Sequence, residues 1–171
     1  GNIRAASLAV GSRCLRLARP VEALPKGVVS VTSIACAARF LCENPGRALL
    51  TTGSKELAPY TSVADYAERF FVRVLPLPGA ITKCIDAGFS PSHVIGMQGP
   101  FTRELNEAML RQVGAQWLVT KDSGTVGGTA EKIASARDVG ARCIVVARPA
   151  EGGGALSLRE VEDALFREFA R

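Results

Sequence analysis

WLVTKDSGTVGGTAEK, residues 117–132, is the stretch that decides the fold. Its first four residues have the apolar and β-branched character of a buried strand, and a polar, glycine-bearing turn follows at residues 121–128. Thr129 is then expected to cap a helix. A strand, a glycine-bearing loop and a helix start in this order form a place for an anion, because free backbone N–H groups and the helix dipole favour negative charge there.

Short apolar strands and helices with apolar residues three and four positions apart alternate along the rest of the chain. Strands are expected at residues 13–18, 28–31, 48–51, 69–75, 93–97, 117–120 and 143–147. Such alternation is typical of parallel sheets that are covered by helices. The sequence therefore predicts an α/β fold, a doubly wound Rossmann-like parallel sheet with helices on both faces.

Capping residues predict where several helices begin. Thr102 is expected to cap a helix whose buried residues are Leu105, Ala108, Met109 and Val113. Ser157 and Glu160 form a capping box for the last helix, whose expected buried residues are Leu158, Val161, Leu165 and Phe169. The first ten residues also have helical spacing but no helix start, so we expect the chain to begin inside a helix; a short natural N-terminus after processing is the alternative.

Ligands of doubly wound folds lie beyond the carboxyl ends of the strands. Three expected strands lead into polar, glycine-bearing loops, which should converge on one edge of the sheet. The candidate binding residues in these loops are Thr52, Gly53, Ser54, Gln98, Gly99, Lys121, Asp122, Ser123, Gly124, Gly127 and Gly128. For the glycine cluster at residues 124–128 the alternative is a tight turn without a ligand, since no P-loop and no G-x-G-x-x-G motif is present.

Individual residues of these loops have both binding and structural interpretations. Lys121 could meet a phosphate as a point charge. Asp122 could accept a hydrogen bond from a ribose hydroxyl, but anchoring the loop as an Asx turn is the favoured role. Ser54 is expected to cap a short helix that begins at residue 55, and Lys132 to be a solvated helix charge.

No catalytic residue is assigned from the sequence. His93, the one histidine, follows Pro91 and Ser92 away from the loop edge, so a structural role is favoured over a catalytic one. No Ser/His/Asp set and no cluster of carboxylates is indicated. The chemistry would then be carried by a bound cofactor that the protein positions.

Composition excludes several classes of protein. The chain has 171 residues, 47% of them hydrophobic, without an apolar run of the roughly 20 residues that a membrane span needs. Five scattered cysteines and one histidine do not suggest a metal site, and we expect reduced, mostly buried thiols of a cytoplasmic protein. One reactive thiol is the alternative.

The formal net charge of +5 favours an anionic partner. Basic residues are spread along the chain without a run and with few aromatic residues beside them. An anionic small ligand therefore explains the charge as well as nucleic acid would, and nucleic-acid binding is not expected.

Four segments together resemble the precorrin-6A reductase family (cobalt-precorrin-6A reductase) of cobalamin biosynthesis, and the resemblance covers nearly the whole chain. They are LLTTGSKEL at 49–57, FFVRVLPLP at 70–78, VIGMQGPFTRELNEAMLRQ at 94–112 and LVTKDSGTVGGTAEKIASAR at 118–137. The MQGPF and TKDSG segments are the most specific of these motifs.

The resemblance implies two Rossmann-like domains that face a cleft holding NADPH and an anionic tetrapyrrole, precorrin-6A or its cobalt form. A hydride and a proton reduce one double bond of the macrocycle to give precorrin-6B. The three loops match the loops at the cleft, and contacts of NADPH with Lys121, Asp122 and Ser123 follow from the motif. A substrate with many carboxylates also accounts for the positive charge.

The family begins with a strand and a glycine-rich turn that have no counterpart here. The resemblance therefore implies that residues 1–26 are the tail of a first domain and a linker, and that residues 27–171 are the second domain. A fragment of this kind need not have the activity of the family. The alternative function is a non-catalytic nucleotide- or anion-binding module with the same fold.

Overall fold

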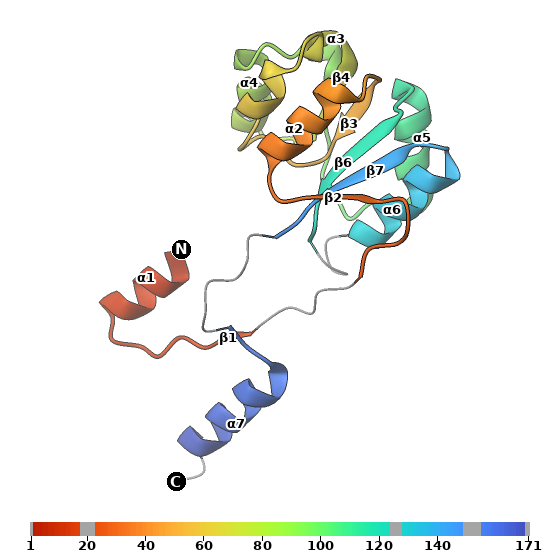
Figure 1. Cartoon of the computed structure of the whole chain (residues 1–171). Coiled ribbons are helices and arrows are strands. Elements are labelled where there is room, and N and C mark those ends of the chain that lie inside the picture. The colour runs from red at the N-terminus through yellow and green to blue at the C-terminus, as the bar shows by residue number, and fades with distance from the viewer. Residues whose placement is uncertain (1, 18–22, 124–127, 149–154, 170–171) are drawn as a thin grey trace. The chain divides into compact units, whose positions relative to one another are not determined.

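The computed structural model describes residues 2–17, 23–123, 128–148 and 155–169. Its contacts divide the chain into two units, Glu22–Pro149 and a smaller one made of Gly1–Val21 with Ala150–Arg171 (Figure 1). The last helix thus belongs to the same unit as the first. The assignment of residues 1–26 to a preceding domain and of 27–171 to a second domain stays a prediction.

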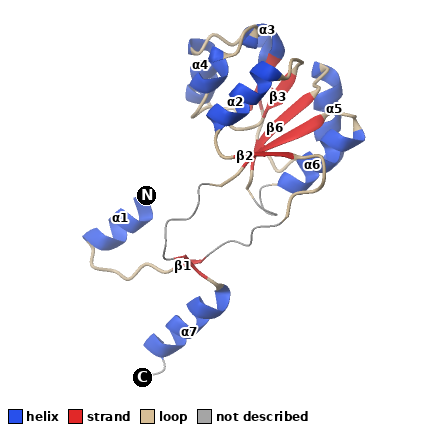
Figure 2. Cartoon of the chain, in the orientation of Figure 1, coloured by secondary structure: helices blue, strands red, loops and turns tan. Residues whose placement is uncertain are grey.

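The larger unit is built on a six-stranded, all-parallel sheet with the strand order β2-β7-β6-β3-β4-β5. The strands are β2 (Val29–Val31), β3 (Ala48–Leu50), β4 (Phe70–Val74), β5 (Val94–Gly96), β6 (Trp117–Lys121) and β7 (Arg142–Val146). Helices α2, α3 and α4 lie on one side of the sheet and α5 and α6 on the other (Figure 2). The predicted Rossmann-like α/β fold is confirmed.

The first face of the sheet is covered by α2 (Ile34–Glu43), α3 (Tyr66–Arg69), α4 (Pro78–Asp86) and the 3₁₀ turn η1 (Ala58–Ser62). Ser33 caps α2, since its side chain accepts a hydrogen bond from the backbone N–H of Cys36. The helix buries its apolar stripe, which is Ile34, Ala37, Ala38 and Leu41. These side chains join those of β3, β4, β6 and β7 in one core cluster.

The second face is covered by α5 (Arg103–Val113) and α6 (Thr129–Asp138). Thr102 caps α5 as predicted, because its hydroxyl accepts from the N–H of Leu105. The predicted buried face is partly wrong: Leu105 and Ala108 are exposed, whereas the buried residues are Asn106, Met109, Leu110 and Val113. The helix is rotated toward Asn106 because this amide has a polar partner, Arg73, on the sheet beneath it.

β6 lies inside the sheet, paired with β3 on one side and with β7 on the other. Its first four residues are at most 4% exposed, since Trp117 and Val119 face one core cluster and Leu118 the other. The ring of Phe40 from α2 packs edge-on against that of Trp117, with centroids 5.3 Å apart. The strand is buried from Trp117 to Thr120 and becomes half-exposed at Lys121, where the loop begins.

The smaller unit contains α1 (Asn2–Ala9), β1 (Arg16–Leu17), β8 (Ala155–Leu156) and α7 (Leu158–Phe169). β1 and β8 pair in parallel, and Arg13 forms a 2.9 Å ion pair with Glu168. The capping box at the start of α7 is confirmed, with 2.7 Å between Ser157 Oγ and Glu160 Oε2. The expected buried face of α7 is wrong, since Leu158, Leu165 and Phe169 are 61%, 42% and 79% exposed.

The five cysteines are free thiols, but only Cys84 and Cys143 are buried. The expectation of mostly buried thiols is therefore wrong, since Cys14 and Cys42 are exposed and Cys36 is half-buried. Within the described ranges, no helix has the length and apolarity that would let it cross a membrane. In the same ranges, no cluster of three or more potential metal ligands occurs.

The orientation of α5 is tested by the same substitution at two positions of one helix. Leu110 is 1% exposed, so Leu110→Ala should leave a cavity and lower the free energy of unfolding by about 2–5 kcal/mol. Leu105 is 37% exposed, so Leu105→Ala should lower the free energy of unfolding by less than about 1 kcal/mol. Urea unfolding of both variants measures the difference, and equal costs would contradict the observed helix face.

Candidate functional site

The three candidate loops leave the carboxyl ends of β3, β5 and β6. Because every strand of the sheet is parallel, these ends lie at the same edge, as predicted. β3 and β6 are neighbours, so the loops that carry Thr52 and Lys121 are adjacent. The loop that carries Gln98 lies farther along the edge, because β4 separates β5 from β3.

Lys121 joins the two adjacent loops. Its Nζ lies 2.7 Å from Oε1 of Glu56, in the loop that follows β3. The two side chains are 40% and 56% exposed, and exposed pairs of this kind contribute little to stability. Lys121 can therefore exchange Glu56 for an incoming anion at small cost.

Asp122 is held by Arg148, which follows the neighbouring strand β7. The Arg148 guanidinium donates to Oδ1 of Asp122, with NH2 at 3.2 Å, and Nε donates to its backbone carbonyl at 3.2 Å. The ion pair is mostly buried, with the two side chains 20% and 22% exposed. These contacts support the favoured structural role of Asp122, with Arg148 as the anchor.

Ser123 and Thr129 close the base of the loop. The backbone N–H of Ser123 donates to the Thr129 hydroxyl at 3.0 Å, and the two hydroxyl oxygens are also 3.0 Å apart. Thr129 is the first residue of α6, and the cap position belongs to Gly128, which has a left-handed φ of 66°. The prediction of Thr129 as the cap is therefore wrong, because its hydroxyl serves the loop. Gly124 and Gly127 lie outside the described residues.

The loop after β3 brings a buried hydroxyl pair to the edge. Thr52 Oγ1 lies 3.3 Å from the Tyr60 hydroxyl, and burial raises the pKa of Tyr60. Gly53 has a φ of 81°, and no atom lies within 4 Å of the point that a Cβ would occupy. A ligand can therefore approach the backbone there. Ser54 is half-buried but caps no helix, because the first helical turn begins later, at Ala58. The predicted helix at residue 55 is wrong.

Gln98 and Gly99 are exposed after β5. A side-chain carbon at Gly99 would lie 3.0 Å from the ring of Phe101, so glycine lets this ring pack against the backbone. Phe101 in turn lies over Arg73 of β4, with the guanidinium carbon 4.0 Å from the ring centroid. The Gln98 loop thus covers a buried cation at the carboxyl edge.

Two basic residues at this edge are absent from the predicted candidates. Arg73 is 5% exposed, and its NH1 donates to Oδ1 of Asn106 at 2.7 Å. Lys132 is half-buried and its Nζ donates to the buried hydroxyl of Thr120 at 3.4 Å, so the prediction of a solvated helix charge is wrong. The sequence does hold one signal for Arg73, since it interrupts the apolar strand FFVRVL.

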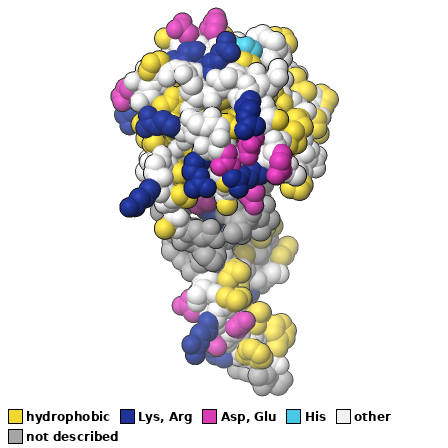
Figure 3. All heavy atoms as spheres, turned by 90° about the vertical axis from the view of Figure 1, so that its right-hand side faces the viewer, with side chains coloured by type: hydrophobic (Ala, Val, Ile, Leu, Met, Phe, Trp, Pro, Cys, Tyr) yellow, Lys and Arg dark blue, Asp and Glu magenta, His cyan; other side chains and the backbone are white. Residues whose placement is uncertain are grey.

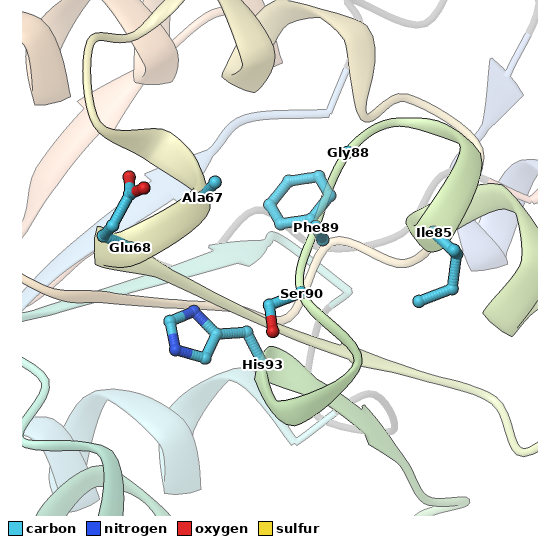
Figure 4. Close-up of a pocket in the computed structure, with 7 residues that line it drawn as sticks. All are labelled: Ala67, Glu68, Ile85, Gly88, Phe89, Ser90 and His93. Atoms are coloured by element: carbon cyan, nitrogen blue, oxygen red, sulfur yellow. The ribbon is translucent and has the colours of Figure 1, made fainter.

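A separate hollow of about 500 Å³ lies at the opposite edge, around His93 (Figure 4). His93 ends the 3₁₀ turn η2 (Pro91–His93) before β5, and its ring stacks on Phe71 with centroids 3.9 Å apart. Its Nδ1 is buried and has no hydrogen-bond partner in the described part of the chain. His93 lies away from the loop edge, as expected, and its structural role stays a prediction.

The outer face over α5 and α6 carries charges of both signs. Lys and Arg side chains lie beside Asp and Glu side chains in Figure 3. Arg103 pairs with Glu107 and Asp138, and Arg111 also pairs with Glu107. The described residues on this face therefore form no continuous basic stripe, which nucleic-acid binding would require.

Comparisons with known proteins point to one family. The family described as "Precorrin-6x reductase CbiJ/CobK" matches residues 1–166. The cobalt-precorrin-6A reductase of Methanothermobacter thermautotrophicus is 38% identical over 144 residues, which are 81% of this chain and 46% of that protein. That of Salmonella typhimurium is 42% identical over 104 residues, or 60% of this chain and 39% of that protein.

A solved structure described as "CobK precorrin-6A reductase" shares the fold, with a TM-score of 0.72 at 23% identity. The likeness covers 99% of this chain and 68% of that one. The chain spans about half the length of the curated relatives it matches.

The two ion pairs of the loop are expected to differ in strength. Asp122→Asn should lower the free energy of unfolding by about 1–3 kcal/mol, because it weakens mostly buried bonds to a guanidinium. Glu56→Gln should cost less than about 1 kcal/mol, because its pair is exposed. Urea unfolding at low ionic strength measures both, and a larger cost for Glu56→Gln would contradict the anchoring role of Asp122.

Proposed function

This chain belongs to the precorrin-6x reductase family, and we propose on that basis that it takes part in the NADPH-dependent reduction of precorrin-6A to precorrin-6B in cobalamin biosynthesis. The substrate is an anionic tetrapyrrole, with or without cobalt. The observation that carries the proposal is the family match across residues 1–166, which includes all three loops of the carboxyl edge. The free thiols suit a reducing compartment, and we place the protein in the cytoplasm.

The residues at the carboxyl edge fit an anionic dinucleotide. The open space beside Gly53 allows a phosphate or ribose to approach the backbone. Lys121 supplies a positive charge that is paired with the exposed carboxylate of Glu56, and Thr52 and Ser123 supply hydroxyls on adjacent loops. When bound, the nicotinamide supplies a hydride that, together with a proton, reduces one double bond of the macrocycle.

In this proposal the chain's own residues bind and orient the reactants. Lys121 leaves Glu56 to meet a phosphate, while Asp122 stays with Arg148 and keeps the loop in place. Ser123 and Thr129 hold the base of the same loop against α6. The remaining candidates, Ser54, Gln98, Gly99 and Gly128, line the edge where the cofactor and macrocycle lie, and Gly124 and Gly127 belong to the same loop in sequence.

The second candidate function is a nucleotide- or anion-binding module without catalysis. The observation that favours it is that the described residues of the carboxyl edge offer a positive charge, hydroxyls and open backbone, which serve to bind an anion. Both functions predict binding of NADPH at the carboxyl edge. They differ in whether precorrin-6A is reduced.

NADPH binding is tested by fluorescence titration of the 171-residue chain. Lys121→Ala should weaken binding about tenfold, which corresponds to ~1.4 kcal/mol, and Ser123→Ala should weaken it less. Glu56→Gln should tighten binding, because Lys121 then has no carboxylate to leave. Lys83→Ala is the matched control, since Lys83 is exposed on α4, away from the loops.

Unchanged affinity in Lys121→Ala and Ser123→Ala would contradict the assignment of the cofactor site. The rate of NADPH oxidation with precorrin-6A then separates the two functions. Turnover supports the reductase, and binding without turnover supports the non-catalytic module.

A further inference from the structure

Tyr60 closes the loop that follows β3 from inside the core. It lies in η1, and its ring packs edge-on against that of Phe70, with centroids 6.1 Å apart. Tyr60 is fully buried, and its hydroxyl oxygen lies 3.3 Å from Oγ1 of Thr52. A buried hydrogen bond between side chains therefore joins the two ends of the loop that contains Gly53.

The burial of this pair determines which hydroxyl donates. Burial raises the pKa of Tyr60, and the charge of Glu56 acts in the same direction, so the phenol keeps its proton. Among the described residues, Thr52 is the one hydrogen-bond partner of the phenol. A buried donor without an acceptor loses its hydration and gains nothing in return. The phenol of Tyr60 therefore donates, and Oγ1 of Thr52 accepts.

The Thr52 hydroxyl is left with a proton to donate. In the described ranges, no other side chain or carbonyl bonds to this hydroxyl. Thr52 is 8% exposed and directly precedes Gly53, where a ligand has room to approach the backbone. A hydroxyl that accepts one hydrogen bond becomes a better donor for the next, because bonds in a chain polarise one another. Thr52 thus suits a ligand atom that accepts.

The charge beside this loop favours a phosphate oxygen as that acceptor. Nζ of Lys121 lies 2.7 Å from Oε1 of Glu56, which belongs to the same loop as Thr52. Both side chains of the ion pair are exposed, so an incoming anion can take the place of the carboxylate at small cost. A phosphate oxygen accepts hydrogen bonds and also carries the negative charge that Lys121 attracts.

We propose that Tyr60 is a positioning residue, which holds the Thr52 hydroxyl as a hydrogen-bond donor to a phosphate oxygen at the carboxyl edge of the sheet. Tyr60 is buried and acts only through Thr52. Two hydrogen bonds in sequence, from the phenol to Thr52 and from Thr52 to the phosphate, form a relay. That this phosphate belongs to NADPH rests on the proposed function.

Fluorescence titration with NADPH tests the relay in the wild type, Tyr60→Phe, Thr52→Val and the double variant. Thr52→Val should weaken binding about tenfold, because the donor is lost. Tyr60→Phe should weaken binding about threefold, because the donor remains but is no longer held in direction. The double variant should bind no more weakly than Thr52→Val, since Tyr60 acts through Thr52.

Tyr66→Phe is the matched control. The Tyr66 hydroxyl donates to the carbonyl of Ala87 at 2.9 Å, and its ring packs edge-on against Phe89, which lines the hollow around His93. Loss of this hydroxyl should leave the affinity for NADPH unchanged. Thr52→Ser keeps a hydroxyl at the edge and should recover most of the affinity that Thr52→Val loses.

A purely structural role of the bond between Thr52 and Tyr60 predicts a different pattern. Both single variants break this bond, so a loosened loop alone would weaken binding equally in the two. Phosphorus NMR of bound NADPH gives a second readout, because the shift of one phosphate should change in Thr52→Val and, by less, in Tyr60→Phe. Equal losses in the single variants, no loss in either, or a further loss in the double variant overturns the relay.

Inorganic pyrophosphate, followed by phosphorus NMR, separates this proposal from the proposed function. If the chain binds pyrophosphate but not NADPH, the same pattern among the four chains keeps the relay and contradicts the assigned cofactor. Binding of NADPH that depends on Lys121 but not on Thr52 contradicts the relay alone. A wild-type chain that binds neither probe overturns both proposals.

Discussion

Strand β6 is covered by helices on both faces of the sheet and is paired with a strand on each side. The rest of the larger unit depends on this burial. Val119 pairs with Leu50 of β3 and with Ile144 of β7, and all three side chains are fully buried. A slip of one residue would move Thr120 from the α6 face to the α2 face and leave Lys132 without its hydroxyl partner. The register of β6 therefore fixes the positions of Lys121 and Asp122 at the carboxyl edge.

Several charged side chains lie at the carboxyl edge of the sheet. Lys121 pairs with Glu56 and Arg148 pairs with Asp122, so these two carboxylates already have partners. Arg73 and Lys132 also lie at this edge, where Arg73 donates to the amide of Asn106 and Lys132 donates to the hydroxyl of Thr120. The edge thus carries more positive than negative charge, which suits both a dinucleotide and a macrocycle with carboxylates.

The elements of the larger unit could be predicted because their signals are local. Ser33 and Thr102 each cap a helix, as expected of a polar residue that comes directly before a helix with an apolar face. Asn106 and Lys132 could not be placed, because the burial of a polar residue depends on a partner from another element, Arg73 or Thr120. The two-residue strand β8 was beyond prediction for the same reason, since its only partner in the sheet is β1, more than a hundred residues away.

The most direct test of the account is to map NADPH onto the chain by NMR, through shifts of the backbone amides. Binding at the carboxyl edge predicts the largest shifts at Thr52, Gly53, Lys121 and Ser123, with smaller ones at Gln98. Amides of η2 at the opposite edge, such as His93, should not move. Shifts concentrated around His93, with none in the loops after β3 and β6, would contradict the account.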